Sequence, residues 1–218
     1  SYILACYRRA ALKSHESAMK YFLLGSFATA FFLYGVAMVY GATGSTSLLV
    51  IRAVAAHSAG NQVLLTLGFG MLFVGMAFKI ATAPFQVWTP DVYEGAPTPV
   101  TALLASGPKA AAFAVLLRIV FTAFGDASGT WFWITWASAA LTMVVGNFAA
   151  VVQSNIKRML GYSTIAQVGY MLIGVAATGP EDWRIPGVLL YLLTYLFMNL
   201  GAFAVVITVS NALDSDEI

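Results

Sequence analysis

Basic side chains interrupt long apolar stretches of this sequence, and two of them, Lys79 and Lys109, are its strongest candidates for chemistry. A lysine at the centre of a bilayer costs about 2.5–3.5 kcal/mol, so such a residue usually faces a protein interior or a wet cavity. Loss of hydration makes a lysine able to take up and release a proton near neutral pH. We therefore predict a proton relay through Lys79 and Lys109. Lys20 and Arg118 also lie in apolar stretches, but snorkelling to the lipid headgroups explains them as well.

Each of the two lysines has a proline nearby. Pro84 follows Lys79 by five residues, and Pro108 immediately precedes Lys109. A proline removes a backbone donor and weakens the helical hydrogen-bond ladder, and transporters use interrupted helices to build ion sites at membrane depth. We therefore expect a proline-broken helix at Lys79. We also expect a hydrated interior between the second and third spans, into which both ammonium groups point.

The segments that carry these lysines are predicted to be transmembrane helices. Of 218 residues, 60% are hydrophobic and 9% are charged, and the mean hydropathy is +0.83, whereas soluble domains carry about a quarter charged residues. A helix of about 20 apolar residues spans a bilayer. Six such stretches are present, at residues 17–40, 62–85, 101–124, 131–152, 156–177 and 185–210. Strand patterns are absent, so we predict an all-α, polytopic transmembrane helix bundle that forms a single domain over residues 1–218.

Two polar connections separate the first three spans. Residues 42–61 are expected to form a polar loop, and the insert TPDVYEGAPTPV at residues 89–100 contains three prolines and cannot continue a straight helix. We expect Asp91 and Glu94 to lie in a solvated loop there, although paired carboxylates can also act as acid and base.

Cofactor chemistry has no candidate residues in this sequence. The single cysteine, Cys6, cannot form an internal disulfide or supply the thiolates of an iron–sulfur cluster. His15 and His57 are too far apart in sequence to suggest a metal site, and no GxGxxG fingerprint opens a helix after a strand. The net charge of +2 is too small to indicate nucleic acid as a partner. We therefore expect no metal and no bound cofactor in this chain.

Basic residues in the connections predict an orientation, because Lys and Arg concentrate on the cytoplasmic side. One cluster precedes the first full span and another begins the fifth, with an even number of spans between them; they contain Arg8, Arg9, Lys13, Lys157 and Arg158. Both clusters should therefore face the cytoplasm or the mitochondrial matrix. The opposite connections carry Arg52, Asp126, Glu181, Asp182 and Arg184.

Three stretches of this sequence resemble one family closely. They are FKIATAPFQVWTPDVYEGAPTPVTALLASGPKAAAF at residues 78–113, QSNIKRMLGYSTIAQVGYMLIG at 153–174 and ESAMKYFLLGSFATAFFLYGVAMVYG at 16–41. All three resemble the antiporter-like subunit N of proton-pumping NADH:quinone oxidoreductase, respiratory complex I, in that family's order. The family is homologous to subunits of Mrp-type cation/proton antiporters, and the sequence TPDVYEGAPTPV favours subunit N.

The resemblance implies roles for individual residues. Lys79 matches the central protonatable lysine of one half-channel, on the broken seventh helix, and Lys109 matches the eighth-helix lysine that passes protons along the membrane arm. Glu16 and Lys20 match charged positions at the start of the sixth helix, although an i, i+4 pair that anchors a helix end explains them as well. Gln86 stands where many relatives have a histidine, and its amide cannot titrate.

The resemblance also implies an assembly. The chain corresponds to a fragment that runs from the end of the fifth to the eleventh of about fourteen helices. A fifth-helix glutamate that pairs with Lys79 would lie upstream of it, and a twelfth-helix lysine downstream. The expected partners are other membrane-arm subunits, the lipid bilayer and protons, in the bacterial inner membrane or, alternatively, the mitochondrial one. NADH, flavin, iron–sulfur clusters and quinone are expected in partner subunits. An Mrp-type antiporter subunit and an inactive structural subunit are the alternative functions.

Overall fold

Six helical segments are long and apolar enough to cross a membrane. The computed structural model describes residues 1–8, 11–57, 62–125, 128–177, 181–213 and 215. Within these ranges every regular element is a helix, which confirms the all-α prediction. The six segments are Leu12–Thr43, Gln62–Ile80, Thr98–Ala123, Trp131–Val151, Ile156–Ala176 and Trp183–Leu213. Each overlaps one predicted span, so the number and order of the predicted spans are confirmed.

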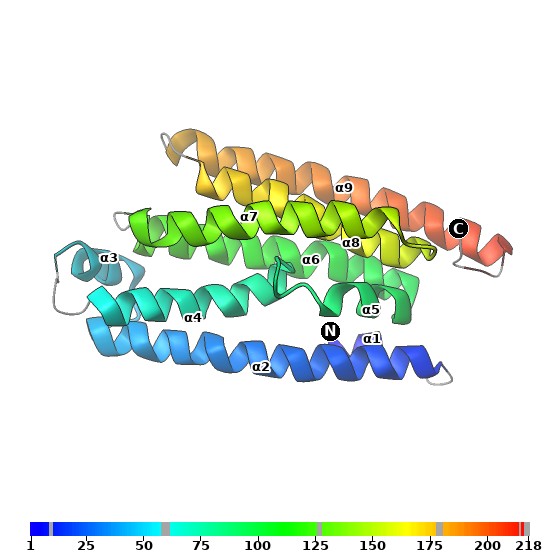
Figure 1. Cartoon of the computed structure of the whole chain (residues 1–218), viewed down its shortest axis with the longest axis horizontal. Coiled ribbons are helices and arrows are strands. Elements are labelled where there is room, and N and C mark those ends of the chain that lie inside the picture. The colour runs from blue at the N-terminus through cyan, green and yellow to red at the C-terminus, as the bar shows by residue number, and fades with distance from the viewer. Residues whose placement is uncertain (9–10, 58–61, 126–127, 178–180, 214, 216–218) are drawn as a thin grey trace.

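The long helices run side by side along the bundle (Figure 1). In chain order the elements are α1 (Tyr2–Ala5), α2 (Leu12–Thr43), α3 (Leu48–His57), α4 (Gln62–Ile80), α5 (Trp88–Gly95), α6 (Thr98–Leu117), the π-helix η2 (Arg118–Ala123), α7 (Ser128–Val151), α8 (Ile156–Ala176) and α9 (Glu181–Leu213). Helix α2 packs against α4, α7 packs against α8, and α9 packs against α6 and α8. The short α5 contacts both α2 and α8, so two full spans fix its position.

Glycines allow close approach in two helix pairs. A Cβ added to Gly35 of α2 would lie 2.6 Å from the backbone nitrogen of Leu72 in α4. One added to Gly146 of α7 would lie 2.5 Å from the backbone nitrogen of Ala166 in α8. Small residues at membrane helix crossings let the backbones approach, because packing replaces the hydrophobic effect as the attraction between helices in lipid. A larger side chain at either glycine would therefore push its helix pair apart.

Both polar connections contain helices that we did not predict from the sequence. Helix α3 occupies residues expected to form a polar loop, and its 10 residues are too few to cross a bilayer. Helix α5 begins at Trp88 and includes Pro90 in its first turn. Proline is tolerated there because the amides of a first helical turn have no intrahelical partner. The expectation of a loop at Asp91 and Glu94 is therefore wrong.

The second span ends earlier than expected. Helix α4 ends at Ile80, and the chain becomes helical again at Trp88. Ala81 adopts a left-handed conformation with a φ of 66°, which turns the chain away from the helix axis. Pro84 lies in this interruption, and its role as the cause stays a prediction. Pro108, in contrast, lies inside α6, which continues through it.

The two basic clusters lie at the same end of the bundle, as predicted. Lys13 at the start of α2 and Arg158 at the start of α8 both form ion pairs with Glu94. This contact agrees with an even number of spans between them. The assignment of this end to the cytoplasm stays a prediction. Arg9 and Asp126, which were part of that assignment, lie outside the described residues.

Candidate functional site

The interruption between α4 and α5 lies about midway along the bundle (Figure 1), and Lys79 is next to it. Lys79 occupies the last turn of α4, where backbone carbonyls without intrahelical partners stabilise a positive charge. Its Nζ atom donates a hydrogen bond to the hydroxyl oxygen of Tyr21 in α2, with 3.3 Å between the two atoms. The half-buried ammonium group is therefore tied to a neighbouring span.

Side chains satisfy backbone groups that the interruption frees. The Ala83 amide donates to Thr142 Oγ1 in α7 at 2.9 Å, and the Thr82 and Thr142 hydroxyls bond each other. Trp88 Nε1 donates to the carbonyl oxygen of Phe78 at 2.9 Å. Non-helical backbone at membrane depth needs such partners inside the protein, because lipid offers none. These bonds therefore stabilise the interruption as a built feature of the bundle.

A cavity of about 400 Å³ opens beside Lys79, between α2, α4 and α6. Thr29 lines it from α2, and Pro108 and Ala112 line it from α6. Among the described residues that line it, only Lys79 is charged. Most of its wall is apolar, and its polar side chains are Lys79, Thr29 and Tyr2. Buried water needs polar partners, so the part of the cavity next to these side chains is the place that can hold water.

Lys109 is buried in α6, with 1% of its surface exposed. Its Nζ atom lies 5.5 Å from the centre of the Tyr93 ring in α5 and makes no hydrogen bond to any described residue. The Tyr93 and Thr164 side chains are also buried. A buried ammonium group without hydrogen-bond partners is costly, and a cation–π contact offsets only part of that cost.

Lys79 and Lys109 have different surroundings. The residues of α6 that line the cavity beside Lys79 do not include Lys109, which lies against Tyr93 of α5 instead. That both ammonium groups point into one hydrated interior between the second and third spans therefore stays a prediction. Sequence spacing could not reveal these surroundings, because it does not fix the rotation of α6 about its axis.

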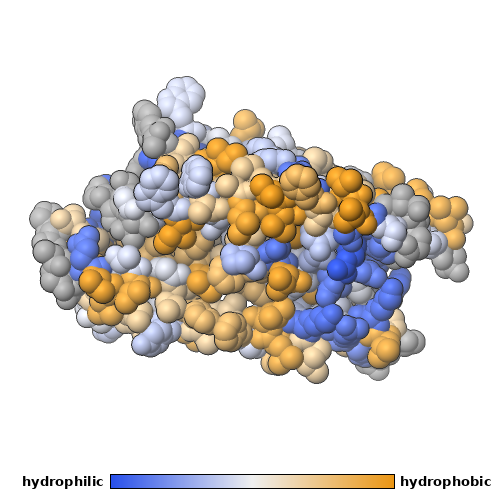
Figure 2. Space-filling model, in the orientation of Figure 1, coloured by the Kyte–Doolittle hydropathy of each residue, from blue (hydrophilic) through white to orange (hydrophobic). Residues whose placement is uncertain are grey.

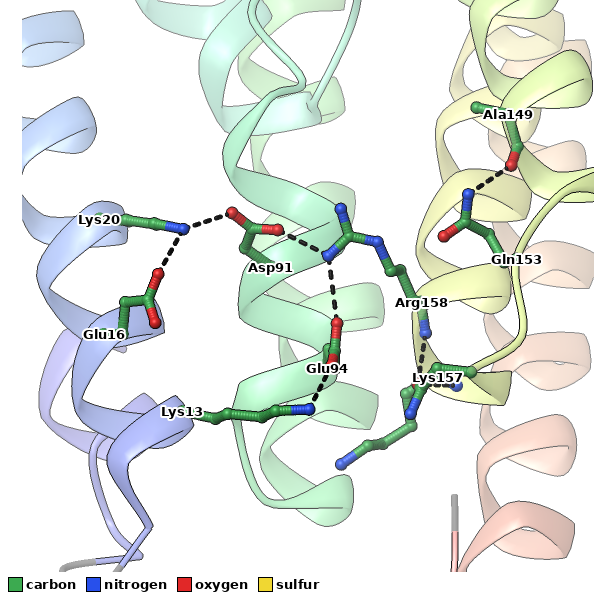
Figure 3. Close-up of polar contacts among 10 residues, drawn as sticks. Lys13, Glu16, Lys20, Asp91, Glu94, Ala149, Gln153, Lys157 and Arg158 are labelled. Atoms are coloured by element: carbon green, nitrogen blue, oxygen red, sulfur yellow. Dashed lines mark hydrogen bonds and ion pairs between the residues drawn. The ribbon is translucent and has the colours of Figure 1, made fainter. Parts of the chain in front are cut away.

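A chain of alternating charges joins three helices at the end of the bundle where α2 begins (Figure 3). We call it the ion-pair chain; its pairs are Glu16–Lys20 at 2.7 Å, Lys20–Asp91 at 2.9 Å, Asp91–Arg158 at 2.7 Å, Arg158–Glu94 at 3.1 Å and Glu94–Lys13 at 2.9 Å. Its three carboxylates balance its three cations. The ion-pair chain borders a cavity of about 170 Å³. Figure 2 shows hydrophilic residues gathered at this end of the molecule.

Asp91 and Glu94 join the ion-pair chain because each carboxylate binds two cations. They are three residues apart and therefore lie on one face of α5. Burial alone raises the pKa of Asp91, but hydrogen bonds from Lys20 and Arg158, together with their charges, hold this pKa below its ordinary value. The same balance, with Lys13 and Arg158 as donors, lowers the pKa of Glu94. Both carboxylates stay ionised at neutral pH and tie α5 to α2 and α8.

The structure pairs Glu16 with Lys20 but places this pair away from Lys79 and Lys109. Their i, i+4 ion pair has an N–O distance of 2.7 Å, and the two side chains are 60% and 44% exposed. The next residue, Tyr21, points the other way and reaches Lys79. Among the described contacts, Lys20 reaches Asp91 of α5, and neither Glu16 nor Lys20 reaches Lys79 or Lys109.

Sequence reasoning missed three residues that hold this region together. Tyr21 and Thr142 lie in apolar spans, where single hydroxyl-bearing residues are common, so no sequence signal distinguishes them. Arg158 was assigned only to the topology, although it binds both carboxylates of α5. The spacing of Asp91 and Glu94 was a usable signal, because an i, i+3 pair suggests one helical face.

These features define a polytopic membrane protein with ionisable residues inside its helix bundle and an interrupted span beside one of them. The family model described as NADH:quinone oxidoreductase/Mrp antiporter, TM matches residues 1–218. The chain belongs to this family, as its resemblance to subunit N predicted.

Similar proteins agree with this assignment. NADH-quinone oxidoreductase subunit N 1 of Solibacter usitatus is 53% identical over 206 residues, which cover 94% of this chain and 42% of the relative. A chain of respiratory complex I from Thermus thermophilus with bound aureothin superposes with a TM-score of 0.76 and 45% identity, over 93% of this chain and 42% of that one. A chain of the membrane-bound sulfane sulfur reductase, an archaeal respiratory membrane complex, superposes with a TM-score of 0.84 and 26% identity, over 99% of this chain and 44% of that one. The chain thus spans less than half the length of each of these proteins.

Proposed function

We propose that this chain is part of a membrane-arm subunit of an NADH:quinone oxidoreductase and that it moves protons through a half-channel centred on Lys79 and Lys109. One observation carries the proposal: a six-span bundle holds Lys79 beside a cavity at a helix interruption and Lys109 fully buried. Lysines inside a membrane bundle are expensive, and their usual reason is an ion or proton pathway.

The surroundings of the lysines support a path for protons. Helices α4 and α6, which carry Lys79 and Lys109, contact each other. A proton does not cross a dry gap, so transfer needs water or hydroxyl groups between the two nitrogen atoms. The cavity beside Lys79 offers room for water. The buried Tyr93 and Thr164 hydroxyls can each donate and accept a hydrogen bond in the core that holds Lys109.

Electron transfer belongs to partner subunits in this proposal. A single cysteine cannot supply the thiolate ligands of an iron–sulfur cluster. NADH, flavin, iron–sulfur clusters and quinone would bind elsewhere in the assembly, and conformational or electrostatic changes there would drive proton movement here. The partners are other membrane-arm subunits. The compartment is the bacterial inner membrane, since the relatives described above include bacterial proteins.

The Mrp-type cation/proton antiporter is the second candidate, because the family model covers both kinds of protein. Such a subunit would use the same lysines with a sodium or potassium counter-ion. The 53% identity to a protein named subunit N favours the oxidoreductase.

Substitution of Lys79 tests the proposal in the full-length subunit, assembled in its complex and reconstituted into vesicles. Lys79→Ala should leave membrane insertion intact, because it removes a costly charge, but should strongly reduce proton pumping driven by NADH oxidation. Lys79→Arg should also impair pumping, because arginine is always protonated and cannot release a proton in each cycle. Equal pumping by the arginine variant would show that titration at this position is unnecessary.

A further inference from the structure

Tyr21 holds the side chain of Lys79 at the interruption. Among the described residues, its hydroxyl is the hydrogen-bond partner of the Lys79 ammonium group, with 3.3 Å between Nζ and the hydroxyl oxygen. The same Nζ atom lies 5.7 Å from the centre of the Tyr21 ring. The shorter distance shows that the lysine contacts the hydroxyl end of the ring rather than its face. A cation–π contact is therefore secondary here, and the hydroxyl group decides the interaction.

The ring of Tyr21 is fixed, so its hydroxyl has a defined direction. Tyr21 is 1% exposed and stacks on Trp88 of α5, with 4.6 Å between ring centres and 20° between ring planes. Phe78 of α4 lies parallel to it at 6.3 Å, and Tyr2 of α1 meets it edge-on at 4.5 Å. Trp88 is itself held by its hydrogen bond to the Phe78 carbonyl. Rotation of Tyr21 away from Lys79 would break this aromatic cluster.

A phenol suits this position because it serves both protonation states of a lysine. It accepts a hydrogen bond from the ammonium group and donates one to the neutral amine. Few other described groups can do this, and the glutamate expected upstream would, as a carboxylate, only accept a hydrogen bond from the ammonium form. Helices α2, α4 and α6 bring no second charged side chain among the described residues to the cavity, and Tyr2 of α1 is the other titratable group that lines it.

We propose that Tyr21 is the positioning residue of Lys79, whose hydroxyl keeps the lysine nitrogen at the interruption in both protonation states. The inference rests on the proposed role of Lys79 in proton movement. Tyr21 keeps its own proton in this scheme, and Lys79 exchanges protons with water in the cavity. Without the hydroxyl, the nitrogen atom would explore the cavity and meet its proton donor and acceptor less often.

The variant Tyr21→Phe tests this in the full-length subunit within the assembled complex. It retains the ring that stacks on Trp88 and deletes only the hydroxyl. Tyr34→Phe is the matched control, because it makes the same atomic change in α2 at a residue that is 58% exposed. We expect Tyr21→Phe to assemble normally and to pump protons several-fold less per NADH oxidised, while the control pumps at the wild-type ratio.

The pH profile separates positioning from a general structural effect. Hydrogen bonds to charged groups are stronger than those to neutral ones, so the lost hydroxyl penalises the ammonium form more than the amine. The alkaline limb of the pumping profile should therefore move to lower pH by about half to one unit in Tyr21→Phe. A scaled-down profile without such a shift would contradict positioning.

The outcomes distinguish this inference from the proposed function. If Lys79→Ala abolishes pumping while Tyr21→Phe keeps the wild-type rate and pH profile, the positioning role is wrong and the proton role of Lys79 stands. If Lys79→Ala pumps normally, the proposed function fails first. Failure of Tyr21→Phe to assemble would also overturn the inference, because the hydroxyl would then be needed for folding.

Discussion

Replacement of Asp91 by asparagine should loosen helix α5. The substitution removes the charge that binds Lys20 at 2.9 Å and Arg158 at 2.7 Å and keeps the side-chain volume. Well-shielded hydrogen bonds to charged groups contribute about 1.5–3 kcal/mol each, and exposed ion pairs about 0.2–1 kcal/mol. The Asp91 side chain is 28% exposed, which puts its contacts between these limits. We therefore expect the docking of α5 to weaken by about 1–2 kcal/mol in total.

Amide hydrogen exchange over residues 88–95 measures this loss directly. A weakening of about 1–2 kcal/mol corresponds to exchange that is roughly 5- to 30-fold faster. Glu16→Gln is the matched control, because Glu16 has a single described ion pair, within α2, and its side chain is 60% exposed. That change should cost about 0.3–0.5 kcal/mol and leave exchange in α5 almost unaltered. Equal effects of the two variants would refute the idea that the ion-pair chain holds α5.

The lowered pKa values of Asp91 and Glu94 predict how this docking depends on pH. A carboxyl group whose pKa is lower in the folded state stabilises that state above its ordinary pKa of about 4, and this stability is lost as the pH falls through the lowered value. Between about pH 5 and 7, the ion pairs should therefore protect the amides of α5 from exchange to their full extent. This protection should begin to fall only below about pH 4, and the fall should be smaller in the Asp91→Asn variant. An acceleration already complete near neutral pH would contradict this reasoning.

Two further substitutions test the interruption and the buried lysine. Thr142→Val leaves the Ala83 amide without its acceptor and should lower the free energy of unfolding by about 1–3 kcal/mol. Thr135→Val should cost less, because the Thr135 hydroxyl bonds the Trp131 carbonyl of its own helix. Equal losses in the two variants would contradict the role of Thr142. Lys109→Met should preserve or raise thermal stability, because it removes a buried cation that has no described hydrogen-bond partner. Proton pumping in vesicles should fall in the same variant. A variant that fails to fold would instead make Lys109 a structural residue.

The fold could be predicted from the sequence wherever one strong physical requirement acted. Each span needs about 20 apolar residues, and this requirement marks six helices whatever their neighbours are. Helix α3 escaped because its Arg52 and His57 make residues 42–61 look polar, although Leu48 and the residues after it are mostly apolar. The early end of α4 at Ile80 escaped because the sequence remains apolar up to Phe85. The chain turns at Ala81, whose backbone is left-handed, and hydropathy does not report backbone conformation.

The candidate site could be predicted only in part. Lys79 and Lys109 were visible because charge in an apolar span is costly wherever it occurs. Their surroundings were not visible, since Tyr21 and Lys79 are 58 positions apart in sequence and meet only after α2 and α4 pack. Arg158 and Asp91, 67 positions apart, are a similar case. Contacts of this kind depend on helix rotation and on the short α5, neither of which a composition pattern fixes.

Two adjacent residues of α2 connect the ion-pair chain to the surroundings of Lys79. Lys20 binds Asp91 of α5 at the end of the bundle, and Tyr21 stacks on Trp88 of the same short helix while it bonds Lys79. Because α2 is a continuous helix, these two contacts fix α5 at two points from one rigid support. A displacement of α5 that breaks the first contact therefore strains the second. Thermodynamic linkage is reciprocal, so any free energy by which the ion-pair chain strengthens the Tyr21–Lys79 contact is also the free energy by which that contact strengthens the ion-pair chain.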